Sequence, residues 1–448
     1  MKPARLLALA TIASLASTGA SLAQSHPEYV PLGRIQAALY KPDSGPAPHI
    51  AYLIAHRTAN QLSTLACTEL ASRGFLVVCF NTRFVNNETI VNWEETPLDV
   101  KAAVDFARAQ PGITKVVLLG HSGGSPLMSF YQAIAENGAA YCQKPERMMK
   151  CGNIPALTPA DGLVFPDAHP GNPAQALRGI NPSLSVVDGK IVVDSTLDPF
   201  SAANGYNPKG PSKYSKDFQT RYYAAQSRAM NAQIAKVMEA KARMAKGEYT
   251  YPDNDIVLVP FSDQEGSAGL MLMDPSIPEF MSTAKPQKLL KNDGSIVRQI
   301  VHSVAVPELG QAESNREFNA GTKVLTFTSY LSANATRSTN SVDGIDHCST
   351  NISTICNLRT VKAPILVAAM GGWRFVRDQE QMYEESPAAD KDFIVVEGAI
   401  HPYTPCQPCE KTPGQYSNTV KNLFDYMAAW TNQRFEPTSF WPKPARRL

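Results

Sequence analysis

Neither sign of charge predominates in this sequence, and basic residues do not gather into a cluster. The 448 residues include 42 lysines and arginines against 40 aspartates and glutamates, which gives a formal net charge of +2. Nucleic-acid-binding proteins usually concentrate positive charge on one face or in one segment, so this pattern argues against nucleic acid as a partner. Internal repeats and low-complexity tracts are also absent. A chain of this length with 44% hydrophobic residues can bury a large core.

Beyond its first residues the sequence has no apolar segment long enough to cross a bilayer. At the N-terminus, Lys2 and Arg5 precede an apolar run that begins at Leu6, and small residues lead up to Ala23. This order is typical of a secretory signal peptide. We expect cleavage after Ala23, which removes residues 1–23 and leaves a secreted or periplasmic chain without a membrane span. A single membrane anchor is the alternative, but serines and threonines interrupt the run.

Cysteines are few, but their number is even and most of them lie in close pairs. In an exported chain this pattern favours disulfides between near neighbours. Pairing of nearest neighbours would join Cys67 with Cys79, Cys142 with Cys151, Cys348 with Cys356, and Cys406 with Cys409, although the sequence alone does not fix the connectivity. Free buried thiols are an alternative, as is a redox or metal role for Cys406-Gln-Pro-Cys409, although a lone CxxC is weak evidence for zinc.

Short apolar segments alternate with segments of helical periodicity over most of the chain. The pattern predicts strands near 49–56, 75–84, 115–122, 161–171, 323–331, 363–372 and 391–401. Such alternation is typical of an α/β fold with a doubly wound, mostly parallel sheet. Between 172 and 320 it gives way to a region rich in Pro, Asn, Gly and Ser, with one long helix expected near 214–246. We therefore expect a core formed by 24–171 and 321–448, interrupted by a large lid or cap insertion over 172–320.

One serine lies among small residues directly after a predicted buried strand. The segment Gly120-His121-Ser122-Gly123-Gly124 matches the G-x-S-x-G nucleophile elbow, with a strand before it and a helix after it. Small neighbours let strand and helix approach, and the sharp turn raises the hydroxyl near the positive end of the helix. A glycine-rich helix start or a phosphate loop is the alternative, but the P-loop Lys-Ser/Thr and the G-x-G-x-x-G spacing are missing. Ser122 is therefore the predicted nucleophile.

The chain has only eight histidines from which to supply a base for this serine. A base is needed because a serine hydroxyl is protonated at neutral pH. His401 follows the last predicted strand, in a loop expected to return to the sheet edge that carries Ser122. His121 is fixed within the elbow, His56 follows the first central strand, and His401 is the predicted general base.

The elbow GHSGG, the strand-end histidine in EGAIH and the strand–helix order around them resemble the α/β-hydrolase superfamily. The resemblance covers roughly 48–167 and 323–433. It implies a serine hydrolase with the chain order Ser, acid, His, and a cap formed by the insertion.

The resemblance also implies an oxyanion hole made of two backbone N–H groups. The first is that of Gly123, directly after the nucleophile. The second comes from the loop after the early strand, where many members have His-Gly and this chain has His56-Arg57-Thr58. The N–H of Arg57 or Thr58 is expected in its place. The Arg57 side chain is either a surface charge or a group that attracts an anionic substrate.

An acid is missing where the family usually carries one. That position, just beyond the penultimate strand, falls near Gly372 and Trp373. Asp378 is the nearest carboxylate and the preferred candidate. The alternatives are Asp167, which follows the preceding strand, together with Glu380, Asp343 and Asp346.

The expected activity is hydrolysis of a carboxylic ester or lactone through an acyl-enzyme on Ser122, with His401 as general base. This chemistry requires no metal or organic cofactor, and its partner is a small ester-like molecule. Hydrolysis of a carbon–carbon bond or an amide on the same triad is an alternative, as is a non-catalytic binding protein. The natural substrate and the oligomeric state are left open.

Overall fold

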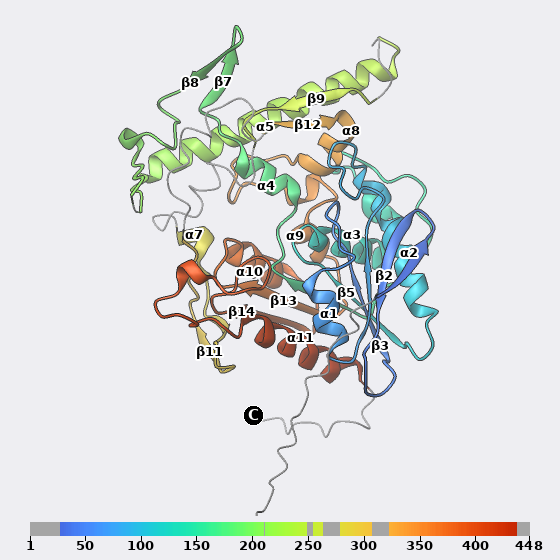
Figure 1. Cartoon of the computed structure of the whole chain (residues 1–448). Helices are drawn as coiled ribbons and strands as arrows, with labels where there is room; N and C mark the ends of the chain where they lie inside the picture. The colour runs from blue at the N-terminus through green and yellow to red at the C-terminus, as the bar shows by residue number, and fades with distance from the viewer. Residues whose placement is uncertain (1–26, 210, 249–253, 263–277, 307–321, 437–448) are drawn as a thin grey trace, which may run out of the picture.

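The structure is a computed structural model of the whole chain, described here for residues 27–209, 211–248, 254–262, 278–306 and 322–436 (Figure 1). The expected signal peptide over 1–23 lies outside the described residues.

A ten-stranded sheet forms the core, in the order β1-β2-β4-β3-β5-β6-β13-β14-β10-β11. Its strands are β1 Glu28–Leu32, β2 Ile35–Tyr40, β3 Ile50–Ile54, β4 Leu76–Phe80, β5 Lys115–Leu119, β6 Gly162–Pro166, β10 Gln287–Leu290, β11 Ile296–Gln299, β13 Ile365–Met370 and β14 Lys391–Val396. All strands from β4 across to β10 pair in parallel, while β1, β2 and β11 are antiparallel additions at the two edges. The predicted mostly parallel sheet is confirmed.

Side chains of the central strands alternate between two apolar clusters, one on each face of the sheet. In β3, Ala51 and Leu53 belong to one cluster, whereas Tyr52 and Ile54 belong to the other. The first face is covered by α2 Thr96–Arg108, α3 Gly124–Asn137, α9 Thr354–Leu358 and α10 Val376–Glu385, and the second by α1 Leu65–Ala71 and α11 Thr419–Phe435. Helices on both faces make the fold doubly wound, as predicted.

The segment expected to form the cap is organised by one long helix, α5 Lys216–Ala245, close to its predicted bounds. The Ser215 hydroxyl begins it by accepting a hydrogen bond from the N–H of Phe218 at 3.1 Å. The other elements here are α4 Asn172–Gly179, β7 Leu184–Val187, β8 Lys190–Val193, η3 Ala202–Asn204, β9 Ile256–Val259 and α7 Pro278–Met281. Figure 1 shows α4, α5 and β7–β9 together on one side of the core.

Two segments depart from the expected organisation. The segment KVLTFTSYL was expected to be a core strand, but β12 Lys323–Thr326 pairs with β9 in a separate two-stranded sheet. Conversely, β10 lies inside the range expected for the cap, yet it pairs in parallel with β14 and extends the core sheet. Apolar content indicates a strand, but it does not say which sheet completes the strand's hydrogen bonds.

Short helical segments complete the described chain. They are η1 Trp93–Glu95, η2 Ala139–Gln143, α8 Phe327–Ser329, the π-helical turn η5 Tyr330–Asn334, η6 His347–Ser349 and η7 Gln407–Cys409. Within the described ranges, no helix combines the length and the apolar character needed to cross a membrane.

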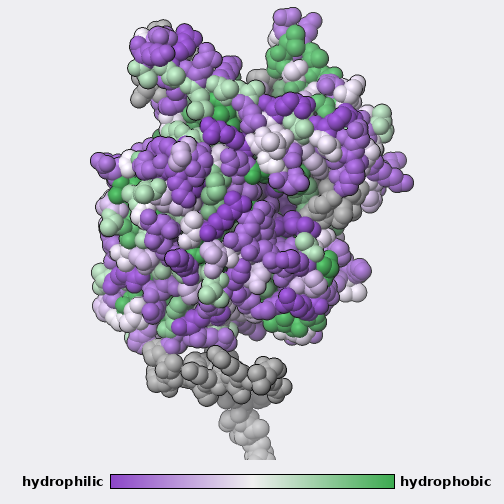
Figure 2. All heavy atoms as spheres, turned by 180° about the vertical axis from the view of Figure 1, so that it is seen from behind, coloured by the Kyte–Doolittle hydropathy of each residue, from purple (hydrophilic) through white to green (hydrophobic). Residues whose placement is uncertain are grey.

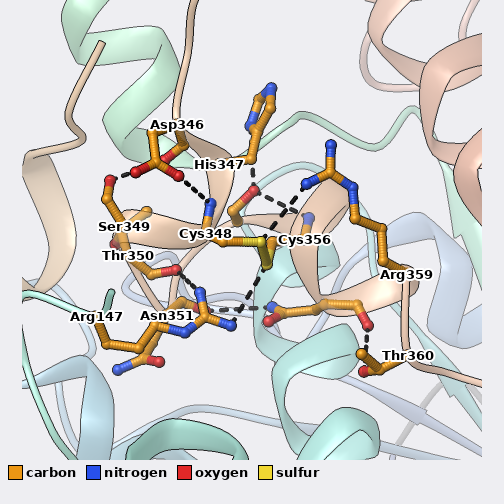
Figure 3. Close-up of a disulfide and its surroundings, with 12 residues drawn as sticks. Arg147, Asp346, His347, Cys348, Ser349, Thr350, Asn351, Cys356, Arg359 and Thr360 are labelled. Carbon is orange, nitrogen blue, oxygen red and sulfur yellow. Dashed lines mark hydrogen bonds between the residues drawn. A yellow bond between two sulfur atoms is a disulfide. The ribbon is translucent and has the colours of Figure 1, made fainter. Parts of the chain in front are cut away.

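All four predicted disulfides are present, and each joins nearest neighbours: Cys67–Cys79, Cys142–Cys151, Cys348–Cys356 and Cys406–Cys409. The third ties η6 to α9 and is flanked by two arginines (Figure 3). Arg147 Nη2 lies 3.4 Å from the sulfur of Cys356, and Arg359 Nη1 lies 3.6 Å from that of Cys348. Every cysteine is thus paired, which is typical of chains that fold in an oxidising compartment.

Candidate active site

The turn that carries Ser122 has the geometry of a nucleophile elbow. Ser122 follows β5, precedes α3 and has a φ of +52°, a region that non-glycine residues rarely adopt. Its small neighbours are required by close contacts. A Cβ on Gly124 would lie 2.2 Å from the carbonyl oxygen of Ala55, and one on Gly120 would lie 2.7 Å from the Cα of Ser125. The elbow therefore tolerates no side chain at either glycine without a backbone shift.

Asp167 lies beside this serine and is bonded to His401. The Ser122 N–H donates to the carbonyl oxygen of Asp167 at 3.3 Å, and Ser122 pairs with Ala168 where the β5–β6 ladder continues past the strand ends. The Asp167 carboxylate is fully buried: Oδ2 hydrogen-bonds His401 Nδ1, and Oδ1 accepts from Gln379 Nε2 at 2.9 Å. A carboxylate on Nδ1 fixes the proton there and leaves Nε2 of the imidazole as a base.

Asp378, the preferred acid at the sequence level, lies elsewhere. Its carboxylate forms a two-pronged ion pair with Arg178 of α4, at 2.7 and 3.1 Å, and both side chains are 6% exposed. Its place on α10 therefore directs it to the cap rather than to His401, and the first choice of acid needs correction in favour of Asp167.

The remaining acid candidates are also engaged away from His401. Glu380 accepts from the backbone N–H of Lys285 at 3.0 Å and from Gln287 Nε2 at 2.9 Å, which fixes the start of β10. Asp343 accepts from Asn340 Nδ2 at 2.7 Å, and Asp346 accepts from the N–H of Cys348 at 3.2 Å. Asp167, one of the alternatives, is thus the candidate acid that reaches the histidine.

Two backbone N–H groups near the elbow make no hydrogen bond among the described residues: those of Gly123 and Arg57. The N–H of Thr58 is committed, because it donates to Nδ1 of His56 at 3.2 Å, as does that of Ala59 at 3.0 Å. The His56 ring packs on the elbow so closely that a Cβ on Gly123 would lie 2.5 Å from its Nε2. Of the predicted oxyanion donors, Gly123 and Arg57 are available and Thr58 is not.

Aromatic rings enclose His401. Nε2 of His121 donates to the backbone carbonyl of His401 at 2.9 Å, and the two ring centroids are 4.5 Å apart. Trp373 stacks on His401, with centroids 5.6 Å apart and planes at 20°. Trp373 occupies the position where the family usually has its acid, and sequence reasoning assigned it no role, as it also assigned none to Gln379. Both follow β13, which is the one signal that would have pointed to them.

The histidines around the site are kept neutral. Burial, followed by the charge of Arg57, lowers the pKa of His56 to about 3. Burial also lowers the pKa of His121 and that of His169 well below the usual value, with His401 and Arg57 as the next causes respectively. His401 keeps 27% of its side chain exposed. His56 and His121 are likewise only partly buried, whereas His169 is 7% exposed.

Within the described ranges, one cluster has a spacing that a metal ion would accept. Ligand atoms of His121, Asp167 and His401 all lie within 4.8 Å of one another. However, His401 Nδ1 is bonded to Asp167, and His121 Nε2 is bonded to the His401 carbonyl. These bonds suit the transfer of a proton better than the coordination of a metal ion.

Comparison with known proteins gives structural matches only; no family model and no curated protein matches the sequence. The solved structures that resemble this chain include the following three. Est1E from Butyrivibrio proteoclasticus is 9% identical over 92% of this chain and 99% of that one, with a TM-score of 0.37. A proline iminopeptidase from Mycobacterium smegmatis is 14% identical over 91% and 98%, with a TM-score of 0.39. A monoglyceride lipase from Saccharomyces cerevisiae is 10% identical over 92% and 96%, with a TM-score of 0.40.

The sheet and the strand–serine–helix elbow together define the class of this protein. A mostly parallel sheet covered on both faces, with a positive-φ serine between β5 and α3, is the α/β-hydrolase fold that the sequence predicted.

Proposed function

We propose that this protein is an exported serine hydrolase that cleaves a carboxylic ester through an acyl-enzyme on Ser122. The triad is Ser122, His401 and Asp167. The observation that carries the proposal is the hydrogen bond between buried Asp167 and Nδ1 of His401, beside a serine held at positive φ.

In this reaction Nε2 of His401 takes the proton of the Ser122 hydroxyl as the oxygen attacks the carbonyl carbon. The negative charge that develops on the carbonyl oxygen is stabilised by the N–H groups of Gly123 and Arg57 and by the start of α3. His401 then protonates the leaving alcohol. A water molecule, deprotonated by the same imidazole, releases the acid and restores the serine.

The buried acid weakens the case for a non-catalytic binding protein. That alternative drew on the missing carboxylate at its usual place, and Asp167 supplies the carboxylate from the neighbouring strand. Export is supported by the pairing of all eight cysteines, because disulfides persist in oxidising compartments.

The test combines a fluorophosphonate probe with a short-chain nitrophenyl ester, for the wild type and for Ser122→Ala. We expect the wild type to be labelled and to hydrolyse the ester. The variant should not be labelled, and its kcat should fall by about 10⁶-fold, the scale seen when a triad serine is removed. Circular dichroism of both proteins controls for folding. A folded wild type that is neither labelled nor active would refute the proposal.

A further inference from the structure

Two side-chain nitrogens of Arg57 have no hydrogen-bond partner among the described residues. The residue is 8% exposed, and its Nη2 is paired, at 2.8 Å from Oε1 of Glu88. The two unpaired nitrogens, Nε and Nη1, are buried. Glu88 is 48% exposed and also bonds the hydroxyl of Thr58, so it meets the guanidinium from the solvent side. Buried polar groups are nearly always paired, so these two nitrogens are free to bind water or a ligand.

His169 provides a further donor near this arginine. It is 7% exposed, and its Nδ1 accepts the N–H of Gly171 at 3.0 Å. The neutral ring therefore carries its proton on Nε2, which makes no hydrogen bond in the part of the chain that the structure describes. The charge of Arg57 is the largest cause, after burial, of the lowered pKa of His169.

Both groups lie close to the reacting atoms. Arg57 follows His56, whose ring touches Gly123 of the elbow. His169 lies two residues after the acid of the triad. The Phe375 ring connects it to the base, with centroids 6.0 Å from that of His169 and 5.9 Å from that of His401.

We propose that Arg57, assisted by Nε2–H of His169, binds a carboxylate of the substrate, so that the enzyme prefers half-esters of dicarboxylic acids. The guanidinium is a permanent cation, and its open Nη1 can donate to one oxygen of a carboxylate while Nη2 stays on Glu88. The inference rests on the proposed function and adds the substrate class.

The experiment compares matched ester pairs: the mono-4-nitrophenyl esters of glutaric, adipic and pimelic acid against the neutral pentanoate, hexanoate and heptanoate. We expect the wild type to prefer at least one half-ester over its neutral partner in kcat/KM. In Arg57→Met the kcat/KM for that half-ester should fall by about 100-fold, and that for the neutral ester by much less, because a bound carboxylate loses its counter-charge. Arg57→Lys keeps the charge but not the planar guanidinium. Its kcat/KM for the half-ester should lie between those of the wild type and Arg57→Met.

Glu88→Gln is the matched control. It removes the negative charge that competes for Arg57, so it should raise the preference for half-esters if the guanidinium binds substrate. If Arg57 only anchors its loop to Glu88, then Arg57→Met and Glu88→Gln should each reduce both esters equally, and the inference fails. A wild type that hydrolyses the neutral esters without preference at any chain length also overturns it. A folded wild type that hydrolyses neither ester and resists the fluorophosphonate instead refutes the proposed function.

Discussion

The core sheet and the cap differ in how completely they bury their strands. Every residue of β3, β4, β6 and β13 is buried, whereas every residue of β8 is exposed. The β7–β8 hairpin stands out as the apolar projection at the upper right of Figure 2, with its valines and isoleucine 38–52% exposed. Strand ends packed on both faces can hold side chains in fixed positions, as Ser122 and Asp167 require. The cap, in contrast, is joined to the second core segment through an apolar cluster of its own, from α4 and α5 to Tyr330 and Leu331 of η5, and through buried polar links such as Arg178–Asp378.

Asp167 and Asp378 allow this comparison to be tested. Asp167 lies at the edge of the core sheet, whereas Asp378 links α10 to the cap. We expect Asp167→Asn to lower kcat by about 10⁴-fold, the loss expected when the base is held in the wrong tautomer. Gln379 Nε2 would keep the oxygen of the new amide on its own side. The amide NH₂ would then face His401 Nδ1 and move the ring proton to Nε2.

The control for this prediction is Asp378→Asn, measured with the same ester and the same active-site titration. It should keep kcat per folded molecule within a few-fold of the wild type, because its partner Arg178 does not contact the triad. Equal losses in the two variants would show that Asp167 does not act through His401.

The next largest effect is expected on stability, from the ion pair between Arg178 and Asp378. Asp378→Ala leaves a buried guanidinium without its carboxylate and should lower the free energy of unfolding by about 3–5 kcal/mol. The double variant Arg178→Met/Asp378→Leu should recover most of this loss, because it removes both charges together. Denaturant unfolding measures both variants, with the exposed Asp343→Ala expected within about 0.5 kcal/mol of the wild type.

How much of the fold could be predicted depended on burial. The central strands are continuous apolar runs and their helices are amphipathic, so periodicity alone located them. The sheet of β12 was predicted wrongly, and β10 was not predicted as a strand. Both strands are short, and each pairs with a strand that lies far away in sequence. β10 is completed by β14, about a hundred residues later, and β12 is completed by β9 in the cap. Local pattern carries no information on such pairings.

At the site, the elbow serine and the strand-end histidine were chosen from the sequence because local context marks both. For the acid the sequence favoured Asp378 over Asp167, although β6 and β13 are neighbours in the sheet and a carboxylate after either strand can reach the same histidine. Asp167 follows β6, whereas the chain after β13 offers Trp373, which stacks on the base. The side-chain contacts separate these choices, because Asp167 bonds His401 whereas Asp378 bonds Arg178.

The smallest expected effect concerns His347, which lies where cap and core meet. It should make the free energy of unfolding depend on pH. Burial, followed by the charges of Arg178 and Arg359, lowers the pKa of His347 to about 3. The imidazole binds a proton near pH 6.5 in the unfolded chain but only near pH 3 in the folded one. The free energy of unfolding therefore has its full value above pH 6.5 and decreases as the pH falls toward 3. The slope from this residue is about 1.4 kcal/mol per pH unit.

We therefore expect His347→Gln to reduce by one proton the number taken up on unfolding between pH 6 and pH 4. Denaturant unfolding at several pH values measures this number. Ser353→Ala removes the hydroxyl that lies 3.2 Å from His347 Nδ1 but leaves the ring buried. It should lower stability at every pH while leaving the slope unchanged, since burial rather than this contact displaces the proton. A slope in His347→Gln equal to that of the wild type would mean that the ring is protonated in the folded protein, and that the junction of cap and core admits charge.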